Sequence, residues 1–482
     1  MSDVAAAPKK KLAAQWMKLG TRFLPFADAA TAELPLGKLL RLSLFQVSVG
    51  MAVVLLIGTL NRVMIVELGV PTWLVAVMIA LPLIFAPIRA VIGFRSDTHR
   101  SALGWRRVPY LWYGTLLQFG GLAIMPFALI ILSGDTTMPV PPLVGQAAAA
   151  LAFLLMGAGL HTVQTAGLAL ATDLAPPESH PKVVSLLCVM MMLGMMASAL
   201  IFGLALAHFS ELRLIKVVQG AGMATAVINI VALWKQEARN PAATARDLAR
   251  PTFAESWGLF AAQGRPVRRL VAVALGTMAF SMQDVLLEPY GGQVLHLSVG
   301  STTGLTAVLA VGGLFGFVVA AKWLMRGVDP YRFAAVGTIT GIAAFSAVVF
   351  ADPLNSIALF AAGVGLIGFG SGIFAHCTLT AAMGLAQRGQ TGMVLGVWGA
   401  VQASAAGIAV ATGGLLRDGV ASLATQGSLG SALSGPGVGY SVVYHCEIAL
   451  LFATLIALGP LVRSTRTRRQ QPFLLAQQTG RI

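Results

Sequence analysis

The fold of this chain is decided by a short polar stretch, Gly93-Phe94-Arg95-Ser96-Asp97-Thr98-His99-Arg100, followed closely by Gly104-Trp105-Arg106-Arg107. A long apolar run beginning near Thr72 precedes it, and another begins at Val108. A short turn between two membrane-length apolar segments must lie at a boundary between lipid and water, and basic loops of this kind stay cytoplasmic. The sequence therefore predicts a membrane-spanning hairpin whose loop faces the cytoplasm.

The spacing within this loop resembles that of the loop between the second and third helices of the major facilitator superfamily. Glycine at Gly93 allows close backbone approach, and Asp97 can accept hydrogen bonds from a helix N-terminus or from an arginine of a facing bundle. The resemblance implies an all-α polytopic membrane protein, with twelve transmembrane helices in two pseudo-symmetric six-helix bundles. It gives Gly93, Asp97, Arg100, Arg106 and Arg107 a structural or gating role, and an ordinary basic loop is the alternative.

The composition is that of a polytopic membrane protein. The 482 residues are 57% hydrophobic and only 11% charged, with a mean hydropathy of +0.80, whereas about 25% of residues are charged in typical soluble domains. The net charge of +15 could indicate nucleic-acid binding. Nearly all lysines and arginines fall in loops on one predicted side, however, so membrane topology explains them better. We therefore expect a lipid bilayer around the protein and no nucleic acid.

Cysteine usage and the amino terminus exclude two further classes. All three cysteines lie in predicted spans, which argues against a disulfide framework or a cysteine-ligated metal. The first apolar run begins near Leu42, too late and too long for a cleavable signal.

Twelve apolar runs come near the roughly 20 residues needed to cross a bilayer. They predict spans at 42–66, 71–92, 108–132, 143–172, 183–207 and 214–235, and at 269–289, 299–324, 333–351, 356–386, 391–416 and 441–462. The charge pattern places both termini in the cytoplasm. The predicted domains are a basic amino-terminal segment (1–41), two six-helix bundles (42–235 and 269–462), the linker between them (236–268) and a cytoplasmic tail (463–482).

The amino-terminal segment has two interpretations. Leu12, Trp16, Leu19 and Phe23 recur at helical spacing, which predicts a short interfacial helix on the inner leaflet. A disordered basic tail that only helps to set topology fits the same residues.

Internal repetition supports two homologous halves. Three pairs of segments occur in matching order in the two halves: Asp97-x-x-Arg100 with Asp329-x-x-Arg332, Asn61–Glu67 with Met282–Glu288, and His161 with His376.

Ionisable residues at membrane depth cost about 2.5–3.5 kcal/mol on insertion scales, so each needs a partner or a function. Arg62 near the end of span one and Asp284 near the matching end of span seven are the natural pair if the halves meet there. With Glu67 and Glu288 they predict either a proton-sensitive gate at the periplasmic mouth or an ion pair that locks the halves together. We favour the lock, because a buried charge pair need not titrate to be retained. Arg89 is expected to snorkel to water.

His161 and His376 are the candidate ligands. Both follow runs of small residues, Gly157–Leu160 and Gly368–Ala375, which let helices or a flat ligand approach closely. A neutral imidazole in an apolar setting can ligate the magnesium of a chlorin ring or hydrogen-bond a neighbouring helix, and the hydrogen bond is the commoner role. Gln164, one turn after His161, joins them as a candidate, and no other metal site is predicted.

Several stretches resemble a particular branch of the superfamily, the bacteriochlorophyll-delivery (PucC/LhaA) proteins of purple phototrophic bacteria. They are Leu42–Met51, Gly58–Gly69, Arg95–Tyr110 and Gln283–Gly292, within a resemblance that covers roughly Leu34 to Leu461. It implies a light-harvesting complex assembly factor in the inner (intracytoplasmic) membrane that transiently binds bacteriochlorophyll a and delivers it to antenna polypeptides. It identifies no pigment ligands, so His161, His376 and Gln164 rest on residue chemistry alone.

The resemblance also suggests partners. These are the light-harvesting antenna polypeptides and the reaction-centre core complex, and beyond them bacteriochlorophyll synthase and a membrane insertase. The long basic amino terminus favours the LhaA type, which serves the core antenna (LH1) around the reaction centre. The PucC type, which serves the peripheral antenna (LH2), is the alternative.

Two other functions compete with pigment delivery. One is a small-solute transporter driven by protons through Glu67, Glu288 or Asp284, and the other is a scaffold that recruits antenna subunits without touching pigment. An ion-coupled transporter should have acidic residues deep in the cleft, whereas here the acids are expected near one surface, which favours ligand binding. No P-loop, Ser-His-Asp set, zinc-ligand spacing or paired catalytic carboxylate is present, so an enzyme is disfavoured.

Overall fold

The structure, a computed structural model, describes most of the chain from Leu34 onward. The described residues are 34–60, 63–64, 68, 70, 72–82, 86–133, 141–206, 210–245, 250–262, 264–297, 299–385, 390–430, 433, 435 and 437–478. The predicted interfacial helix at Leu12–Phe23 lies outside them. Within these ranges the secondary structure is helical, with no strand, as the sequence predicts.

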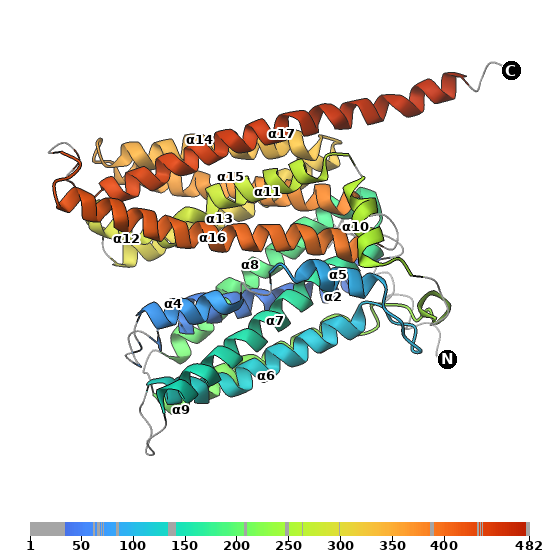
Figure 1. Cartoon of the computed structure of the whole chain (residues 1–482), viewed down its shortest axis with the longest axis horizontal. Coiled ribbons are helices and arrows are strands. Elements are labelled where there is room, and N and C mark those ends of the chain that lie inside the picture. Colours follow the sequence, from blue (N-terminus) through green and yellow to red (C-terminus); the bar gives the residue numbers. More distant parts are fainter. Residues whose placement is uncertain are drawn as a thin grey trace, which may run out of the picture.

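The helices form two groups, one above the other in Figure 1. The lower group, blue to green, contains α2 (Leu36–Val53), the π-helical η2 (Val54–Thr59), α4 (Thr72–Ala80), α5 (Arg89–Asp97), α6 (Val108–Ser133), α7 (Pro142–Leu174), the short η5 (Pro177–Ser179), α8 (His180–Ala205) and α9 (Glu211–Leu233).

The upper group, yellow to red, follows a linker with η6 (Ala242–Thr244) and α10 (Phe253–Ala261). It contains α11 (Pro266–Ser281), the 3-10 turn η7 (Met282–Val285), α12 (Leu287–Gln293), α13 (Val299–Met325), α14 (Pro330–Ala351), α15 (Ile357–Leu385), α16 (Thr391–Thr425) and α17 (Val438–Gln478). The last helix therefore continues into the predicted tail that begins at residue 463.

Ten helices in the described ranges are long and apolar enough to cross a membrane. The other two predicted spans do not form single long helices. The second is divided between α4 and α5, and the seventh is broken by η7 between α11 and α12. Because side chains all around these helices are apolar, the helices are suited to burial in protein and lipid rather than to a water-facing surface.

Small residues set how closely the helices pack. A Cβ added at Gly50 of α2 would collide with the Met191 carbonyl of α8, and one at Gly368 of α15 would collide with the Leu309 carbonyl of α13. Backbones can approach this closely only where glycine leaves the space. The halves meet mainly where α5 packs on α16 and α8 packs on α13.

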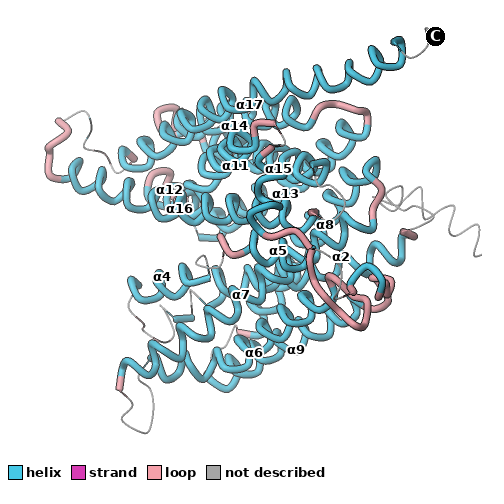
Figure 2. Tube along the Cα trace, turned by 45° about the vertical axis from the view of Figure 1, so that its right-hand side comes forward, coloured by secondary structure: helices cyan, strands magenta, loops and turns pink. Residues whose placement is uncertain are grey.

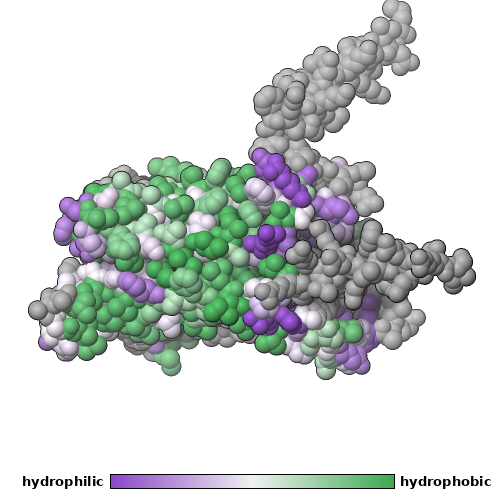
Figure 3. All heavy atoms as spheres, turned by 90° about the horizontal axis from the view of Figure 1, so that it is seen from above, coloured by the Kyte–Doolittle hydropathy of each residue, from purple (hydrophilic) through white to green (hydrophobic). Residues whose placement is uncertain are grey.

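Polar residues gather at the two ends of the helices, where most loops lie (Figure 2), and apolar residues cover the middle of the face shown in Figure 3. We call one end the basic end: it carries the loop between α5 and α6, the chain after α9, and the start of α11. The start of α2 lies at this end, because Gln236 in the chain after α9 donates to the Lys38 carbonyl (3.0 Å). The later part of α17 also reaches this end, because Arg268 at the start of α11 donates to the Ala457 and Ile456 carbonyls (3.0 and 2.8 Å). The charge rule predicts that this end is cytoplasmic.

Candidate functional site

At the basic end a buried carboxylate joins the two halves. Asp97, the last residue of α5, accepts hydrogen bonds from the Gly392 and Met393 amides (2.9 and 2.8 Å) in the first turn of α16. The first amides of a helix have no partner within the helix, and its N-terminus carries partial positive charge, so a carboxylate is a favourable cap. Asp97 thus fastens the first half to the second.

Arg107 completes this contact, which we call the latch (Asp97, Arg107, Gly392 and Met393). Its guanidinium pairs with Asp97, donates to Ser96 Oγ (2.6 Å) and pairs with Asp173 of α7 (3.0 Å). The side chains of Arg107 and Asp97 are only 0% and 1% exposed. Burial raises the pKa of the Asp97 carboxyl, while the charge of Arg107 and the two amides of α16 oppose that shift.

Glycines bring the helices of the latch together. A Cβ at Gly93 would overlap the Gly392 carbonyl, and one at Gly396 would overlap the Arg89 carbonyl. Arg89 is itself buried and donates to Thr165 Oγ1 of α7 (3.0 Å) and to the Gly399 carbonyl of α16 (3.4 Å). The expectation that Arg89 snorkels to water is wrong, because its guanidinium bridges three helices instead.

A second carboxylate caps α6. Glu237, in the chain that leaves α9, accepts from the Arg106, Arg107 and Val108 amides (2.8–3.1 Å). Arg106 also pairs with Asp173 (2.8 Å). Further along, the Asn240 amide donates to the Gly104 carbonyl (2.9 Å). The chain after α9 is therefore held against the loop between α5 and α6.

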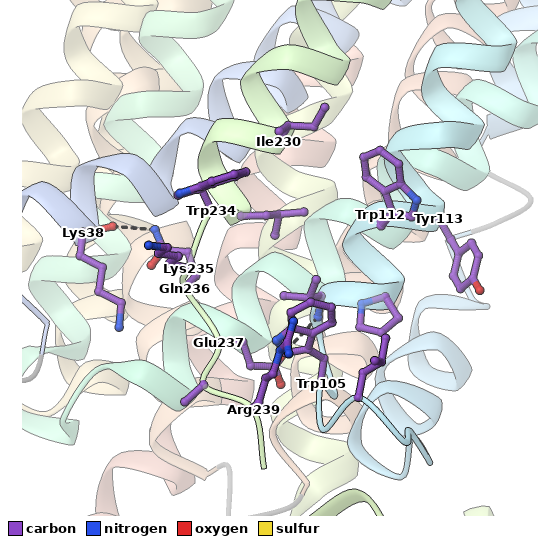
Figure 4. Close-up of a pocket in the computed structure, with 15 residues that line it drawn as sticks. Lys38, Trp105, Trp112, Tyr113, Ile230, Trp234, Lys235, Gln236, Glu237 and Arg239 are labelled. Carbon is purple, nitrogen blue, oxygen red and sulfur yellow. Dashed lines mark hydrogen bonds between the residues drawn. The ribbon is translucent and has the colours of Figure 1, made fainter. Parts of the chain in front are cut away.

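This contact builds one wall of a groove of about 910 Å³ (Figure 4). Four large aromatic side chains come from different segments: Trp105 from the loop, Trp112 and Tyr113 from α6, and Trp234 from the end of α9. The remaining lining residues are mostly apolar or basic: Lys38, Leu103, Val108, Pro109, Ile230, Leu233, Lys235, Gln236, Glu237, Ala238 and Arg239.

The aromatic residues of the groove are largely open to a ligand. Trp112, Tyr113 and Trp234 are 41%, 61% and 59% exposed, and the Arg239 guanidinium lies 4.7 Å from the centre of the Trp105 ring. Tryptophan and tyrosine typically gather at the level of lipid headgroups. A groove of these residues with a basic rim suits a flat apolar molecule that carries a few polar acceptors.

A smaller cavity of about 230 Å³ lies between the halves. It is lined by Met192 of α8 and by residues of α11, η7, α13, α15 and α16, among them Gln283, Asp284 and Gln402. Binding pockets for small molecules usually measure about 300–1,000 Å³. In this conformation the cavity is therefore too small for a large ring with a tail, whereas the groove falls in that range.

The two predicted histidines are buried in helix packing. His161 Nε2 lies 3.2 Å from the Pro82 carbonyl, and its Nδ1 has no hydrogen-bond partner. Neither ring nitrogen of His376 forms a hydrogen bond of acceptable geometry, although the Pro181 carbonyl lies near the ring. Neither histidine lines the groove or the cavity, and Gln164 does not line them either. Magnesium ligation by these residues stays a prediction.

The predicted charge pair at the other end is only partly visible. Arg62 and Glu67 lie outside the described residues, and so does the side chain of Glu288. Asp284 is exposed and lines the smaller cavity, and it accepts from Gln283 Nε2 (2.6 Å). The pairing of Arg62 with Asp284 therefore stays a prediction. Arg100, the remaining loop residue with a predicted structural or gating role, is exposed.

Sequence reasoning missed three carboxylates. Asp173 and Glu237 were not singled out, although both bind the arginines of the loop. Glu447 is fully buried within α17, and it was not among the acids that the sequence analysis placed near one surface. An isolated acid inside an apolar run was the signal that could have found Glu447.

The chain is matched by a family model described as "PUCC protein" over residues 59–466. It belongs to the PucC family. The protein named "Protein PucC" of Rhodovulum sulfidophilum is 57% identical over 83% of this chain and 89% of its own length. An "Uncharacterized protein in puhA-bchM intergenic region" of Rhodobacter capsulatus is 58% identical over 92% of this chain and 93% of its own. A "Bacteriochlorophyll synthase 44.5 kDa chain" of Rhodobacter capsulatus is 30% identical over 80% and 87%.

Solved structures show the fold that this PucC-family chain shares. A bacterial homologue of the iron transporter ferroportin, in an outward-facing state, aligns with a TM-score of 0.67 at 16% identity, over 88% of this chain and 98% of that one. The major facilitator superfamily transporter FucP, in the outward conformation, aligns with a TM-score of 0.60 at 14% identity, over 88% and 98%. The predicted major facilitator fold is confirmed, and the protein is an integral membrane protein.

Proposed function

We propose that this protein binds bacteriochlorophyll and passes it to light-harvesting antenna polypeptides in the intracytoplasmic membrane. Membership of the PucC family supports a role in photosynthetic complexes. The name of the 30% identical relative, "Bacteriochlorophyll synthase 44.5 kDa chain", connects bacteriochlorophyll with a related chain. Pigment delivery requires binding and release, with no covalent chemistry, which agrees with the lack of enzymatic motifs in the sequence.

The observation that carries this proposal is the aromatic groove. Its volume of about 910 Å³ lies at the upper end of the range for small-molecule sites. Trp112, Trp234 and Tyr113 offer flat faces for stacking on a macrocycle, and Lys38 and Arg239 can donate to the carbonyl groups at the edge of such a ring. Its position among interfacial residues would let a pigment enter sideways from lipid.

The two histidines, His161 and His376, are not part of the proposed pigment-binding groove. The free nitrogens of His161 and His376 have the right chemistry for chlorin magnesium, but both rings are enclosed by helices. Ligation by either would require the helices around it to separate. We therefore assign pigment capture to the groove and keep ligation by the histidines as a separate prediction.

We assign the protein to the core antenna, LH1, on its long basic amino-terminal segment (residues 1–41). The peripheral antenna, LH2, is the alternative, since the relatives at 57% and 58% identity do not separate the two. Disruption of the gene in its own host, followed by absorption spectra of the membranes, tests this choice. Loss of the core band with the peripheral band retained supports LH1, and the reverse supports LH2.

The same host tests the groove. Complementation with a Trp112→Ala/Trp234→Ala double variant should fail to restore the antenna, because both stacking faces are gone. Trp323→Ala is the matched control: Trp323 is 44% exposed, close to Trp112, but lies on α13 outside the groove. Full restoration by the double variant at equal protein level would refute a role for the groove.

A further inference from the structure

The seventh span is interrupted between α11 and α12. The α-helix α11 ends at Ser281, a 3-10 turn covers Met282–Val285, and the α-helix α12 resumes at Leu287. A 3-10 segment within a helix often marks a functional position, and broken membrane helices are where transporters coordinate small cations. The residues at this break are Gln283 and Asp284, which also line the cavity between the halves.

A carboxylate with no partner lies beside this break. Glu447 comes nine residues after the start of α17 at Val438, or roughly 14 Å into the helix at 1.5 Å per residue. Its exposure is 0%, and neither carboxylate oxygen has a hydrogen-bond partner of acceptable geometry, although the Gln283 backbone amide lies near the carboxylate. An ionised carboxylate buried without a partner carries a large desolvation cost, so this group needs a positive charge or a proton.

Apart from the Gln283 backbone amide, the polar groups around Glu447 are a second carboxylate, a side-chain amide and a hydroxyl. Asp284 of η7 is close enough for its charge to repel that of Glu447. The Gln283 amide nitrogen is already used by the Phe280 carbonyl (3.1 Å) and by Asp284 (2.6 Å), which leaves its buried Oε1 without a partner. The buried Tyr444 hydroxyl, one turn before Glu447, also has no partner.

Within the described part of the chain, the helices around Glu447 supply no compensating cation. The elements that pack on α17 are α11, α14, α16 and η7. Asp284 is the charged side chain that faces Glu447 from η7, and α12 adds the Tyr290 ring against Tyr444 (5.4 Å). Among the described residues of α11, α14 and α16, no lysine, arginine or histidine pairs with Glu447. The nearest arginine of α16 in sequence, Arg417, is bonded to Asp418 and Tyr440.

We propose that Glu447, Asp284 and Gln283 form a binding site for one small monovalent cation, a proton or a sodium ion, which enters from the cavity between the halves. Two carboxylates with neutral oxygens around them provide the charge and ligands that such an ion needs. Asp284 faces the cavity and receives the ion, and Glu447 holds it behind the break. This site is independent of the aromatic groove and of pigment binding.

Thermal unfolding of the purified full-length protein tests the site and separates the two ions. A proton site predicts that the melting temperature rises by about 2–4 °C when the pH falls from 8 to 6 in sodium-free choline chloride. The folded protein then binds a proton that the unfolded chain releases. A sodium site predicts a similar rise when sodium chloride replaces choline chloride at pH 8.

Variants test whether Glu447 causes the rise in melting temperature with protons or sodium. Glu447→Gln removes the titrating group and should abolish either response, whereas Glu178→Gln, at an exposed position before α8, should keep it. If Glu447→Gln does not fold, Asp284→Asn and the infrared band of a protonated carboxyl in the wild-type protein replace it. A wild-type protein with neither response and no such band would overturn the proposal, as would a Glu447→Gln variant with unchanged responses.

Discussion

Replacement of Asp97 by asparagine should open the basic end of the molecule. Asparagine has nearly the same shape, but it offers one acceptor oxygen instead of two and no charge for Arg107. Asp97 holds two amides of α16 and the buried Arg107. Removal of one partner from a buried ion pair typically costs about 3–5 kcal/mol.

The lost free energy stabilises the contact between the two halves at the basic end, so its loss shifts their equilibrium from the closed form towards an open form. A change of about 3 kcal/mol alters that ratio roughly 160-fold, since each 1.36 kcal/mol is a factor of ten. Asp329→Asn is the matched control. Asp329 occupies the equivalent position in the second half, but the contact that it makes among the described residues is within its own half, where it caps α14 through the Arg332 amide (2.9 Å).

Spin labels at Ala102→Cys and Arg326→Cys, both exposed at the basic end, would measure the separation of the halves. The three natural cysteines, Cys188, Cys377 and Cys446, must first be replaced. The wild type and Asp329→Asn should give one short distance, and Asp97→Asn should add a longer one. A distance distribution for Asp97→Asn that superimposes on the wild type would refute the latch.

Three further predictions follow from named contacts. If Arg62 pairs with Asp284, which would leave Glu447 as the carboxylate of the proposed cation site, exchange of the two charges should restore folded protein lost in either single reversal, measured by size-exclusion chromatography; tolerance of both single reversals would rule out that pair. Glu237→Gln should lower the melting temperature, because the cap on three amides of α6 loses its charge and about 1 kcal/mol; an unchanged value contradicts the cap. His161→Ala/His376→Ala should reduce the pigment bound per protein if these rings ligate magnesium, and unchanged pigment in the purified variant would exclude them.

The role of the loop between α5 and α6 could be predicted from the sequence because it depends on a few residues that are close together in the chain. The Gly93 and Asp97 spacing requires a close helix contact and an acceptor for a helix N-terminus, and the structure has Asp97 on the first amides of α16. The sequence could not say which helix Asp97 would cap, since α16 begins almost 300 residues later in the chain. It also could not show that Asp329 in the repeat caps its own helix α14.

The groove and the Glu447 site were beyond sequence reasoning for a related reason. Trp105, Trp112 and Tyr113 lie close together in the sequence, but Trp234 joins them because Glu237 holds the chain after α9 against the loop. Glu447 matters because α17, the last span, packs on η7, the break in the seventh span that carries Asp284. Periodicity and charge predict which segments cross the membrane, not which side chains meet inside it.

Pigment content of the purified protein tests the central claim most directly. The wild type, purified in mild detergent from a pigment-producing host, should show a near-infrared bacteriochlorophyll band at a fixed ratio to protein, and Trp323→Ala should match it. The Trp112→Ala/Trp234→Ala variant should bind at least roughly 30-fold more weakly, the equivalent of about 2 kcal/mol for loss of a principal aromatic contact. A colourless wild-type protein that still co-purifies with antenna polypeptides would contradict the account.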